Sequence, residues 1–286
     1  MVCFVVLHYM VVEETINCIR NLKTIMNNSD RIIIVDNNSS NNSGVKLKNI
    51  YNKDKQIDII INSENLGFAK GNNAGCNYAK EKYSPDFYIV MNNDVEIQQK
   101  DFIQKIYKIY DDEKFDVLSP DIFSTSQKIH QSPKTLSPMT ISKAKSLKKE
   151  YEKKLKNRWV LKIRCKLKKN KIINNIKKMI KSESIDYTKK YYNVPLHGAC
   201  FIFSKKFVNK RKNVFFENTF LYFESEILDY ECHLYNFKEL YDPEIKVFHN
   251  QNVSTKYIYS NELKRAQFMS RENLNSINEF LKQYDK

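Results

Sequence analysis

One stretch of ten residues, 87–96, constrains the fold more than any other part of the chain. Residues 87–91 are apolar and β-prone, and Asn92, Asn93 and Asp94 follow them at once. A short run that is apolar throughout predicts a strand buried on both faces of a sheet. Polar side chains at the carboxyl end of such a strand lie where an open α/β sheet binds its ligands. Taken alone, a turn after an ordinary core strand explains the stretch more simply. The neighbouring segments therefore decide between such a turn and a ligand-binding edge.

Apolar runs that alternate with helical spacing predict the surrounding domain. Residues 2–7, 31–35 and 57–61 are expected to form strands, and residues 12–23 a helix. This alternation predicts an α/β fold with a mostly parallel central sheet, flanked by helices. Two of the strands are followed by Asp36 and Asp94, which a parallel sheet brings to the same edge. An oxygen-rich edge suits Mg²⁺ or Mn²⁺, which share their ligands with substrate phosphates.

Three of the five glycines fall in one segment, residues 62–75. Gly67, Gly71 and Gly75 are four residues apart, so a helix through them has one bare face. The N-terminus of that helix lies at the same sheet edge and offers free N–H groups to an anion such as a diphosphate. Close packing of the helix on the sheet explains the glycines equally well. The segment matches neither the Walker pattern nor G-x-G-x-x-G, which disfavours a P-loop or an ordinary dinucleotide site.

Three motifs, taken in this order, resemble those of the inverting, metal-dependent nucleotide-sugar glycosyltransferases. They lie at residues 36–39, 65–75 and 91–94. The resemblance is to the family 2 type, and within it to the rhamnosyltransferase-like and capsular or O-antigen polysaccharide branch. It implies the GT-A fold, a Rossmann-like sheet, and covers about residues 1–118 before resuming after an insert.

The resemblance also implies a donor site. Asp36 would bind the nucleobase, with His8 nearby, and Asp94 would hold Mg²⁺ or Mn²⁺ on the diphosphate. Asn92 replaces the first aspartate of the family's D-x-D motif, which removes a charge and implies a modest metal affinity. The residues expected to bind the nucleotide sugar are His8, Asp36, Asn38, Asn65, Gly67, Gly71, Asn72, Asn92, Asn93 and Asp94.

The second half of the chain is expected to supply the acceptor side. A turn and strand are predicted at residues 196–203, a helix at about 224–236, a turn at 241–244 and a last strand at 245–248. By resemblance, His197, Gly198 and Ala199 flank the acceptor pocket, although a structural turn histidine explains His197 as well. His249, directly after the last strand, is expected to be a further metal ligand.

Two acids are candidates for the catalytic base. Glu224 and Glu226 open the predicted helix, where the helix dipole by itself favours acids. An inverting transfer nevertheless needs a carboxylate that deprotonates the attacking hydroxyl. Ser225 interrupts the acidic motif of the family at this position. The choice stays open between the two glutamates, with a slight preference for Glu226.

The formal charge of +15 is concentrated in residues 143–190, which contain 19 Lys and Arg and four acids. Apolar residues there recur three and four apart, which predicts amphipathic basic helices. Such helices suit an anionic membrane surface. A helix packed on the domain is the second interpretation, and nucleic acid binding is not expected. The predicted organisation is a nucleotide-sugar-binding half (1–120), an acceptor-side half (121–142 and 191–286) and this insert.

Several features bear on location and assembly. The six cysteines are scattered and without metal spacing, which predicts reduced thiols in a cytosolic protein. The chain begins with a strand rather than a signal peptide, and contains no apolar run long enough to span a bilayer. A cytoplasmic enzyme, peripheral on the inner face of the cell membrane, is expected. The predicted C-terminal helix, residues 261–284, could complete the core or form an oligomer.

The function predicted from these features is a metal-dependent inverting hexosyltransferase. It would move a sugar from a nucleotide-diphosphate donor to a hydroxyl of a growing cell-surface glycan or lipid-linked acceptor. A nucleotidyltransferase is disfavoured, because the first strand is not followed by a Gly-rich, lysine-bearing loop. Asn92 and Ser225 keep a second alternative open, a catalytically impaired scaffold that acts as a basic membrane- or nucleic-acid-binding protein.

Overall fold

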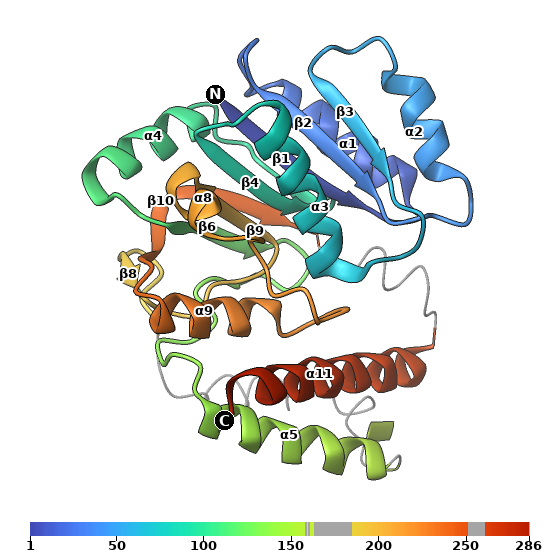
Figure 1. Cartoon of the computed structure of the whole chain (residues 1–286), viewed down its shortest axis with the longest axis vertical. Coiled ribbons are helices and arrows are strands. Elements are labelled where there is room, and N and C mark those ends of the chain that lie inside the picture. Colours follow the sequence, from blue (N-terminus) through green and yellow to red (C-terminus); the bar gives the residue numbers. More distant parts are fainter. Residues whose placement is uncertain (158, 160, 163–184, 251–260, 286) are drawn as a thin grey trace.

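The computed structural model describes residues 1–157, 159, 161–162, 185–250 and 261–285 (Figure 1). The strands are β1 (Val2–His8), β2 (Arg31–Asp36), β3 (Ile57–Ile61), β4 (Phe87–Asn92), β5 (Val95–Glu96), β6 (Val117–Ser124), β7 (Ile129–His130), β8 (Tyr191–Tyr192), β9 (Cys200–Ser204) and β10 (Glu239–His249). The helices are α1 (Val12–Lys23), α2 (Ser43–Tyr51), α3 (Gly67–Lys82), α4 (Phe102–Glu113), α5 (Ile141–Lys156), α8 (Lys205–Lys210), α9 (Glu224–Leu234) and α11 (Glu262–Tyr284).

One sheet carries the fold, and its strand order is β3-β2-β1-β4-β9-β6-β10-β5. Strands β1 to β4 pair in parallel, as the sequence predicts. Strand β9 is antiparallel to both of its neighbours, β4 and β6, whereas β10 is parallel to β6. The predicted α/β fold with a mostly parallel sheet is therefore confirmed. Because β9 lies in the centre, residues before and after the basic insert form a single sheet.

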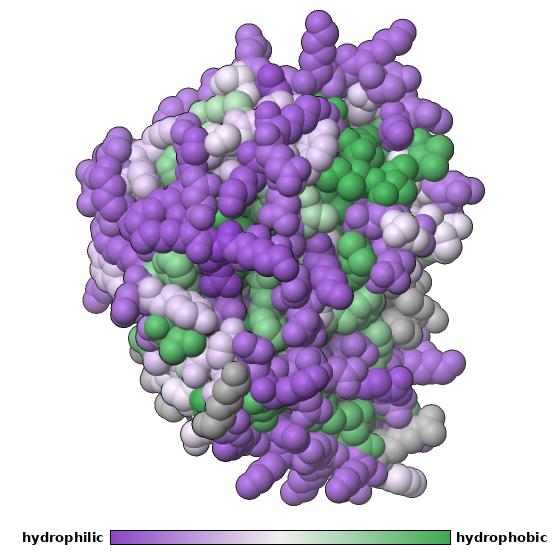
Figure 2. Space-filling model, in the orientation of Figure 1, coloured by the Kyte–Doolittle hydropathy of each residue, from purple (hydrophilic) through white to green (hydrophobic). Residues whose placement is uncertain are grey.

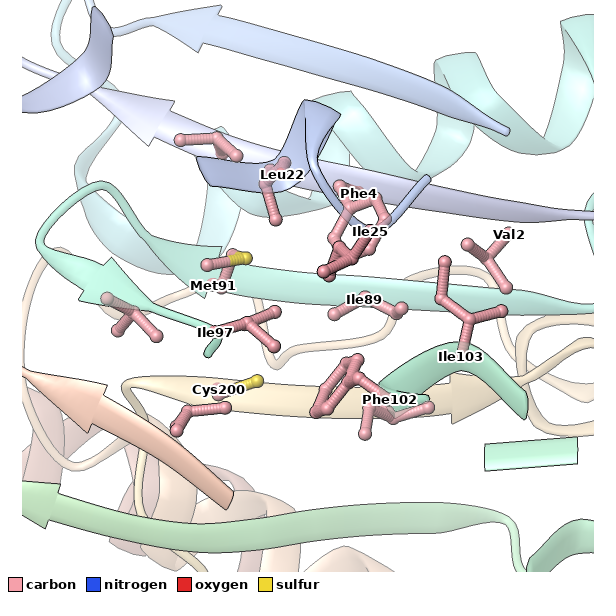
Figure 3. Close-up of a cluster of buried hydrophobic side chains, with 14 of the residues drawn as sticks. Val2, Phe4, Leu22, Ile25, Ile89, Met91, Ile97, Phe102, Ile103 and Cys200 are labelled. Atoms are coloured by element: carbon pink, nitrogen blue, oxygen red, sulfur yellow. The ribbon is translucent and has the colours of Figure 1, made fainter. Parts of the chain in front are cut away.

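Alternate residues of β1 are buried on opposite faces of the sheet, which is why this strand is apolar throughout. Val2, Phe4 and Val6 pack with α1 and α4 in one core cluster (Figure 3). Cys3 and Val5 pack with α3, α8 and α9 in a second cluster on the other face. Burying one such aliphatic or aromatic side chain contributes about 1.5–3 kcal/mol. The two clusters hold the helices against both faces and fix the edge where the strands end.

A third, smaller cluster covers helix α9 from below (Figure 1). Phe223 and Ile227 pack there with Phe280 of α11, and partly buried residues of α5 complete the cluster. Helix α9 is thus held between the sheet and the α5–α11 pair. The beginning of the basic insert packs on the domain in this way. Most of the remainder of the insert lies outside the described residues, so its predicted membrane helices are not tested.

The structure corrects one predicted turn and adds elements that the sequence did not indicate. Residues 241–244 lie within β10 rather than in a turn. Pairing of β10 with β6 passes from Asp242 opposite Pro120 to Lys246 opposite Asp121, so residues 243–245 form an irregularity in the ladder. Such a bulge tolerates Pro243, which has no N–H to give to a regular sheet. Helices α2 and α4 and strand β6 were not predicted.

The remaining expectations on cysteines and on the C-terminal helix can also be compared with the structure. Five cysteines are free and buried, as predicted: Cys3, Cys18, Cys76, Cys200 and Cys232. The sixth, Cys165, lies outside the described residues. The predicted C-terminal helix is α11, which completes the third cluster. Among the described residues, no helix combines the length and apolar composition that crossing a bilayer requires.

Candidate active site

A cavity of about 540 Å³ opens at the edge where β4 and β10 end. Its lining residues come from nine stretches of the chain that are far apart in the sequence. Eleven of the predicted site residues line it: Asn65, Gly67, Asn92, Asn93, Asp94, His197, Gly198, Ala199, Glu224, Glu226 and His249. Five others do not: His8, Asp36, Asn38, Gly71 and Asn72.

Asp94 and His249 face each other in this cavity. Asp94 Oδ1 lies 3.2 Å from His249 Nε2, and both residues are more than nine-tenths buried. His249 Nδ1 donates a hydrogen bond to Gln131 Oε1 at 2.8 Å, which leaves Nε2 free of hydrogen in the neutral ring. Two ligands of an octahedral cation, each at about 2.1 Å and at right angles, lie roughly 3.0 Å apart. The pair therefore fits two adjacent positions around Mg²⁺ or Mn²⁺.

The short strand β5 brings these two residues together. It follows Asp94 directly and pairs with the end of β10, with His249 opposite Val95. The backbone N–H of Asn250 donates to the carbonyl of Asp94 at 2.9 Å. The two metal-ligand candidates are 155 residues apart in the chain, and these backbone hydrogen bonds hold them in register.

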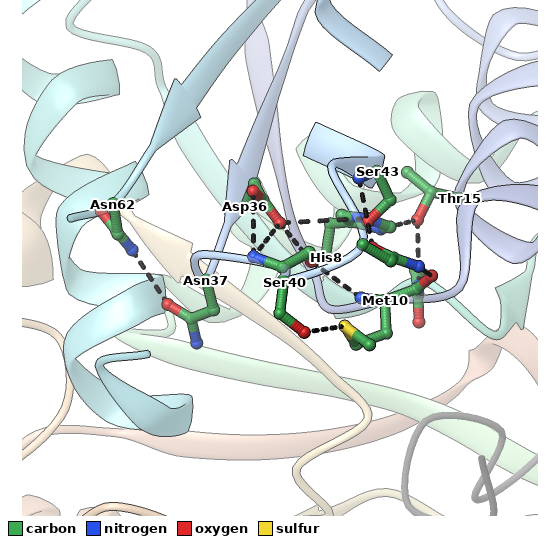
Figure 4. Close-up of polar contacts among 11 residues, drawn as sticks. His8, Met10, Thr15, Asp36, Asn37, Ser40, Ser43 and Asn62 are labelled. Carbon is green, nitrogen blue, oxygen red and sulfur yellow. Dashed lines mark hydrogen bonds and ion pairs between the residues drawn. The ribbon is translucent and has the colours of Figure 1, made fainter. Parts of the chain in front are cut away.

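His8 and Asp36 lie behind the cavity in a buried polar network (Figure 4). His8 Nδ1 is hydrogen-bonded to Thr15 Oγ1 at 2.7 Å, and its Nε2 to Ser43 Oγ at 2.8 Å. Burial lowers the pKa of His8 to about 4, so the ring is neutral near pH 7. Thr15 also accepts a hydrogen bond from Asn93 at 2.9 Å. His8 thus connects the loops after β1, β2 and β4, and both of its ring nitrogens are already engaged.

The Asp36 carboxylate is closed off by its own loop. Ser39 Oγ donates to Asp36 Oδ1 at 2.5 Å, and a side chain added at Gly44 would overlap the carboxylate. In the same loop, the side chain of Asn38 donates to the carbonyl of Ser63. Asn37, which was not predicted, does line the cavity, and its amide donates to the carbonyl of Gly67 at 2.7 Å.

The N-terminus of α3 differs from the prediction of a free anion site. The N–H of Gly67 donates to Asn65 Oδ1 at 3.0 Å, and that of Phe68 donates to the carbonyl of Phe220 at 2.7 Å. Gly67 has φ +75°, and a Cβ there would lie 2.0 Å from that same carbonyl. The glycine at this position therefore serves the approach of the Phe220 backbone. Two of the N–H groups expected to bind an anion already have acceptors.

The other two glycines of α3 serve packing on the sheet. A Cβ at Gly71 would lie 2.6 Å from Leu7 Cδ1, and one at Gly75 would lie 2.4 Å from Val5 Cγ1. Asn72, although buried, donates to the carbonyl of Phe68 within its own helix. The bare face of the helix thus lies against β1. The packing explanation of these two glycines is the one that the structure supports.

The chain enters α9 through an unusual backbone conformation. Tyr222 and Phe223 both have φ 70°, in the left-handed region that costs non-glycine residues of order 1 kcal/mol or more each. Phe223 lies in the third core cluster, while Glu224 and Glu226 line the cavity. Outliers of this kind cluster at functional sites. Here the turn allows the same short segment to anchor in the core and to present two carboxylates.

The two glutamates have opposite electrostatic environments. Burial raises the pKa of Glu224 to about 8, and its Oε1 is buried without a hydrogen-bond partner. Burial also acts to raise the pKa of Glu226, but the charge and hydrogen bond of Lys134 outweigh it and lower the pKa overall. Lys134 Nζ lies 2.5 Å from Glu226 Oε1, and Ser225 Oγ donates to Oε2 at 3.0 Å. At neutral pH, Glu224 is protonated and Glu226 is an ion-paired carboxylate.

His197 lies in the cavity wall as a neutral donor. The N–H of Ala199 donates to His197 Nδ1 at 3.2 Å, which leaves the ring hydrogen on Nε2. Burial, together with the nearby charge of Lys134, lowers the pKa of His197 well below its usual value. The ring centre lies 5.8 Å from that of His249. A neutral ring with one N–H suits a hydrogen bond to a phosphate or hydroxyl oxygen.

Sequence reasoning missed several residues of the cavity wall. They are Leu7, Tyr9, Asn37, Phe68, Lys134, Phe220, Leu221, Tyr222, Phe223, Ser225, Phe268 and Asn273. Tyr9 and Asn37 had a signal in the sequence, because each lies two positions after a predicted strand, at the ligand-binding edge. Lys134 had none, since it lies in a loop whose position depends on contacts with residues about 60 to 90 positions later.

Comparison with known proteins adds a family and several structures. The family model described as glycosyl transferase family 2 matches residues 3–211. None of the curated proteins that were searched matches the chain.

The fold is similar to those of solved structures, although at low sequence identity. The crystal structure of S. aureus TarS 1–349 in complex with UDP superposes with a TM-score of 0.54 at 12% identity, over 94% of this chain and 64% of that one. The crystal structure of S. aureus TarS gives 0.55 at 14%, over 91% and 38%. GalNAc-T7 with UDP, GalNAc and Mn²⁺ gives 0.56 at 12%, over 100% and 56%. The GT-A-like fold is thereby shown, in a chain that spans less than two thirds of the length of these three structures.

Proposed function

The chain belongs to glycosyl transferase family 2, and we propose that it moves a hexose from a nucleotide-diphosphate donor to an acceptor hydroxyl with inversion at the anomeric carbon. The observation that carries this proposal is the pairing of Asp94 with His249 in a cavity that also contains two carboxylates. One side of the cavity thus suits a metal diphosphate, and the other suits deprotonation of a hydroxyl. The rhamnosyltransferase-like and capsular or O-antigen branch remains part of the proposal.

Asp94 and His249 are the residues that would hold Mg²⁺ or Mn²⁺. Their donor set of one carboxylate and one imidazole suits Mn²⁺ in particular, because imidazole is a poorer ligand for Mg²⁺. When bound, such a cation neutralises the charge that develops on the leaving diphosphate. Asn92 and Asn93 line the same wall with neutral amides, which add hydrogen bonds without adding repulsion to the diphosphate.

We assign the deprotonation of the acceptor hydroxyl to Glu224 rather than to Glu226. Both oxygens of Glu226 are engaged, by Lys134 and by Ser225, whereas Glu224 Oε1 has no partner. A general base is most effective when its pKa lies near the working pH. The pKa of Glu224, about 8, meets that condition. This assignment reverses the slight preference for Glu226 that the sequence suggested.

The acceptor is proposed to be a growing cell-surface glycan or a lipid-linked hydroxyl at a membrane surface. Helix α5 exposes Lys149, Lys153 and Lys156 along one side, while its other side packs with α11. Hydrophilic side chains predominate over this lower layer in Figure 2, in the region where Figure 1 places α5 and α11. Lysines so arranged favour an anionic lipid surface, and a peripheral enzyme on the inner face of the membrane follows from the proposal.

Nucleotide release from a panel of UDP-, dTDP- and GDP-sugars, with Mn²⁺, Mg²⁺ or EDTA, tests this function. We expect metal-dependent release from one donor, and a loss of about 10²-fold or more in Asp94→Ala and in His249→Ala. Asp111→Ala is the matched control, since that side chain is 76% exposed and is not among the residues that line the cavity. Absence of release, together with absence of calorimetric binding of every donor, would overturn the proposal.

A further inference from the structure

A second cluster of ligand-type side chains lies outside the cavity, at the opposite end of α9. Asp229 and His233 are four residues apart on α9, so they share one face of the helix. Glu239 begins β10, and the ligand atoms of the three residues lie within 4.8 Å of one another. None of the three lines the catalytic cavity. The cluster therefore needs an explanation of its own.

Three of the four carboxyl oxygens of this cluster are buried without a hydrogen-bond donor. Asp229 is 0% exposed and Glu239 is 1% exposed. Asp229 Oδ1 and both side-chain oxygens of Glu239 have no hydrogen-bond donor. Within the described ranges of the chain, no lysine or arginine forms an ion pair with either residue. A buried, unpaired carboxylate costs several kcal/mol, so this pair demands either a proton or a cation between its acceptors.

We propose that Asp229, His233 and Glu239 bind a divalent transition-metal cation, with Zn²⁺ as the best fit. Imidazole with carboxylates is a usual ligand set for zinc. His233 Nδ1 lies 3.6 Å from Asp229 Oδ1, and two ligands at about 2.1 Å from a tetrahedral zinc lie roughly 3.4 Å apart. His233 is partly exposed, so it gives the cation an entry path and leaves room for water as the fourth ligand.

Binding of the cation has a simple proton balance. In the metal-free cluster, His233 Nδ1 donates its hydrogen to the carbonyl of Asp229 at 2.9 Å. A proton shared between the two carboxyl groups is the alternative to a cation here, because each group has an oxygen without a donor. Zn²⁺ would take the place of this carboxyl proton. If the imidazole bound zinc through Nδ1, the bond to zinc would replace its hydrogen bond to the carbonyl. The ring hydrogen would then lie on Nε2, and the ring would stay neutral.

The cation would connect three separate parts of the chain. Asp229 Oδ2 already accepts the backbone N–H of Met139 at 2.6 Å, in the segment that leads into α5. Glu239 lies at the start of β10. A metal bond from α9 to β10 would thus fix the helix whose first turn carries Glu224. The site is structural in this proposal, and it does not depend on the assigned transferase chemistry.

Zinc binding to the Asp94→Ala variant tests the proposal, because that change removes the competing site in the cavity. After treatment with EDTA and dialysis, calorimetric titration with ZnCl₂ should give one site per chain. The melting temperature should rise by about 5 °C at a hundredfold excess over Kd. Adding His233→Ala should weaken zinc binding at least about tenfold and abolish the shift, because losing even an outer-shell partner costs that much.

Glu239→Gln, in the same Asp94→Ala background, is the second variant. It removes the carboxylate without removing volume, so the protein is expected to fold, which circular dichroism would verify. We expect this variant to lose zinc binding as well. An unchanged zinc stoichiometry in both variants would refute the proposal. So would the absence of zinc binding to the Asp94→Ala protein itself, an outcome that would assign the cluster to a shared proton.

Discussion

Glu224 and Glu226 illustrate how two identical side chains, two positions apart on one helix, acquire different chemistry. Both follow from the same sequence pattern, and both line the cavity. Lys134 selects between them, because its ammonium neutralises Glu226 and leaves Glu224 as a buried carboxyl. The distinction depends on one loop residue 90 positions away from Glu224.

Glu224→Gln should abolish the general-base step. In the wild type, kcat/KM should rise with pH and level off above a pH of about 8, as Glu224 loses its proton. The variant should lose that rise, with activity lower by about 10²-fold to 10⁴-fold. Glu226→Gln is the control and should keep the rise. Retention of the pH profile in Glu224→Gln, with its loss in Glu226→Gln, would move the base to Glu226.

The same substitution, which lowers activity, should raise the free energy of unfolding at alkaline pH. Because the pKa of Glu224 is higher in the folded state than in the unfolded state, the folded protein binds the extra proton between about pH 4.5 and 8. Stability from this group is therefore present at low pH and lost as the pH rises through 8. Glu224→Gln should be more stable than the wild type at pH 8.5, with the difference shrinking toward pH 4.5. Urea unfolding at both pH values measures this difference.

Gln131 should act on the metal through His249. Its side-chain oxygen accepts the Nδ1 hydrogen and so leaves Nε2 facing Asp94. Gln131→Leu removes that acceptor, and we expect Mn²⁺ affinity to fall about 10-fold to 100-fold, the usual cost of losing such a partner. Electron paramagnetic resonance of free Mn²⁺ measures the affinity directly. Equal Mn²⁺ affinity in the variant and in the wild type would contradict this role.

At the scale of elements, α3 shows that a glycine face can be a packing surface. Gly75→Ala would place a methyl group 2.4 Å from Val5 Cγ1 and 2.8 Å from Val35 Cγ2. We expect the free energy of unfolding to fall by about 1–3 kcal/mol, because overpacking outweighs the better helix propensity of alanine. Lys70→Ala, at an exposed position of the same helix, should change it by no more than about 0.5 kcal/mol. Chemical denaturation compares them, and a stabilised Gly75→Ala would show that α3 has room to move.

At the scale of the whole molecule, the α5–α11 layer places a lysine-rich surface on the far side of α9 from the sheet (Figure 1). Exchanging Lys149, Lys153 and Lys156 for glutamine should weaken binding to vesicles that contain anionic lipids. Each lysine near such a surface contributes about 1 kcal/mol, so the loss should reach roughly 10²-fold at low salt. Cosedimentation with vesicles measures it.

The matched control for that triple variant lies at the other end of the molecule. Lys46, Lys48 and Lys53, in and after α2, are also exposed, and their exchange removes the same charge from a different surface. This control should bind vesicles as the wild type does. Equal losses in both triple variants would mean that only net charge matters, and would contradict a directed membrane surface on α5.

The sequence by itself determined the strands β1 to β4, the helix α1 and the edge at which polar residues gather. Continuous apolar runs have few alternatives to buried strands, and a parallel sheet necessarily collects their carboxyl ends. Asp94 and His249 could be assigned to one site for this reason, combined with the family resemblance. The central position of β9 and the length of β10 could not be predicted, because strand order and bulges depend on pairing between distant segments.

Only the tertiary structure decided which edge residues line the cavity and in what state. Ser39 and Gly44 cover the carboxylate of Asp36. The carbonyl of Phe220 accepts the N–H of Phe68, which was expected from the sequence to bind an anion. Lys134 likewise lowers the pKa of Glu226 but leaves that of the buried Glu224 raised. Each of these contacts joins loops whose positions follow from packing rather than from local pattern. Hydrogen bonding and burial there depend on atoms that are near in space and remote in sequence, and this dependence is the physical limit of what the sequence alone could determine.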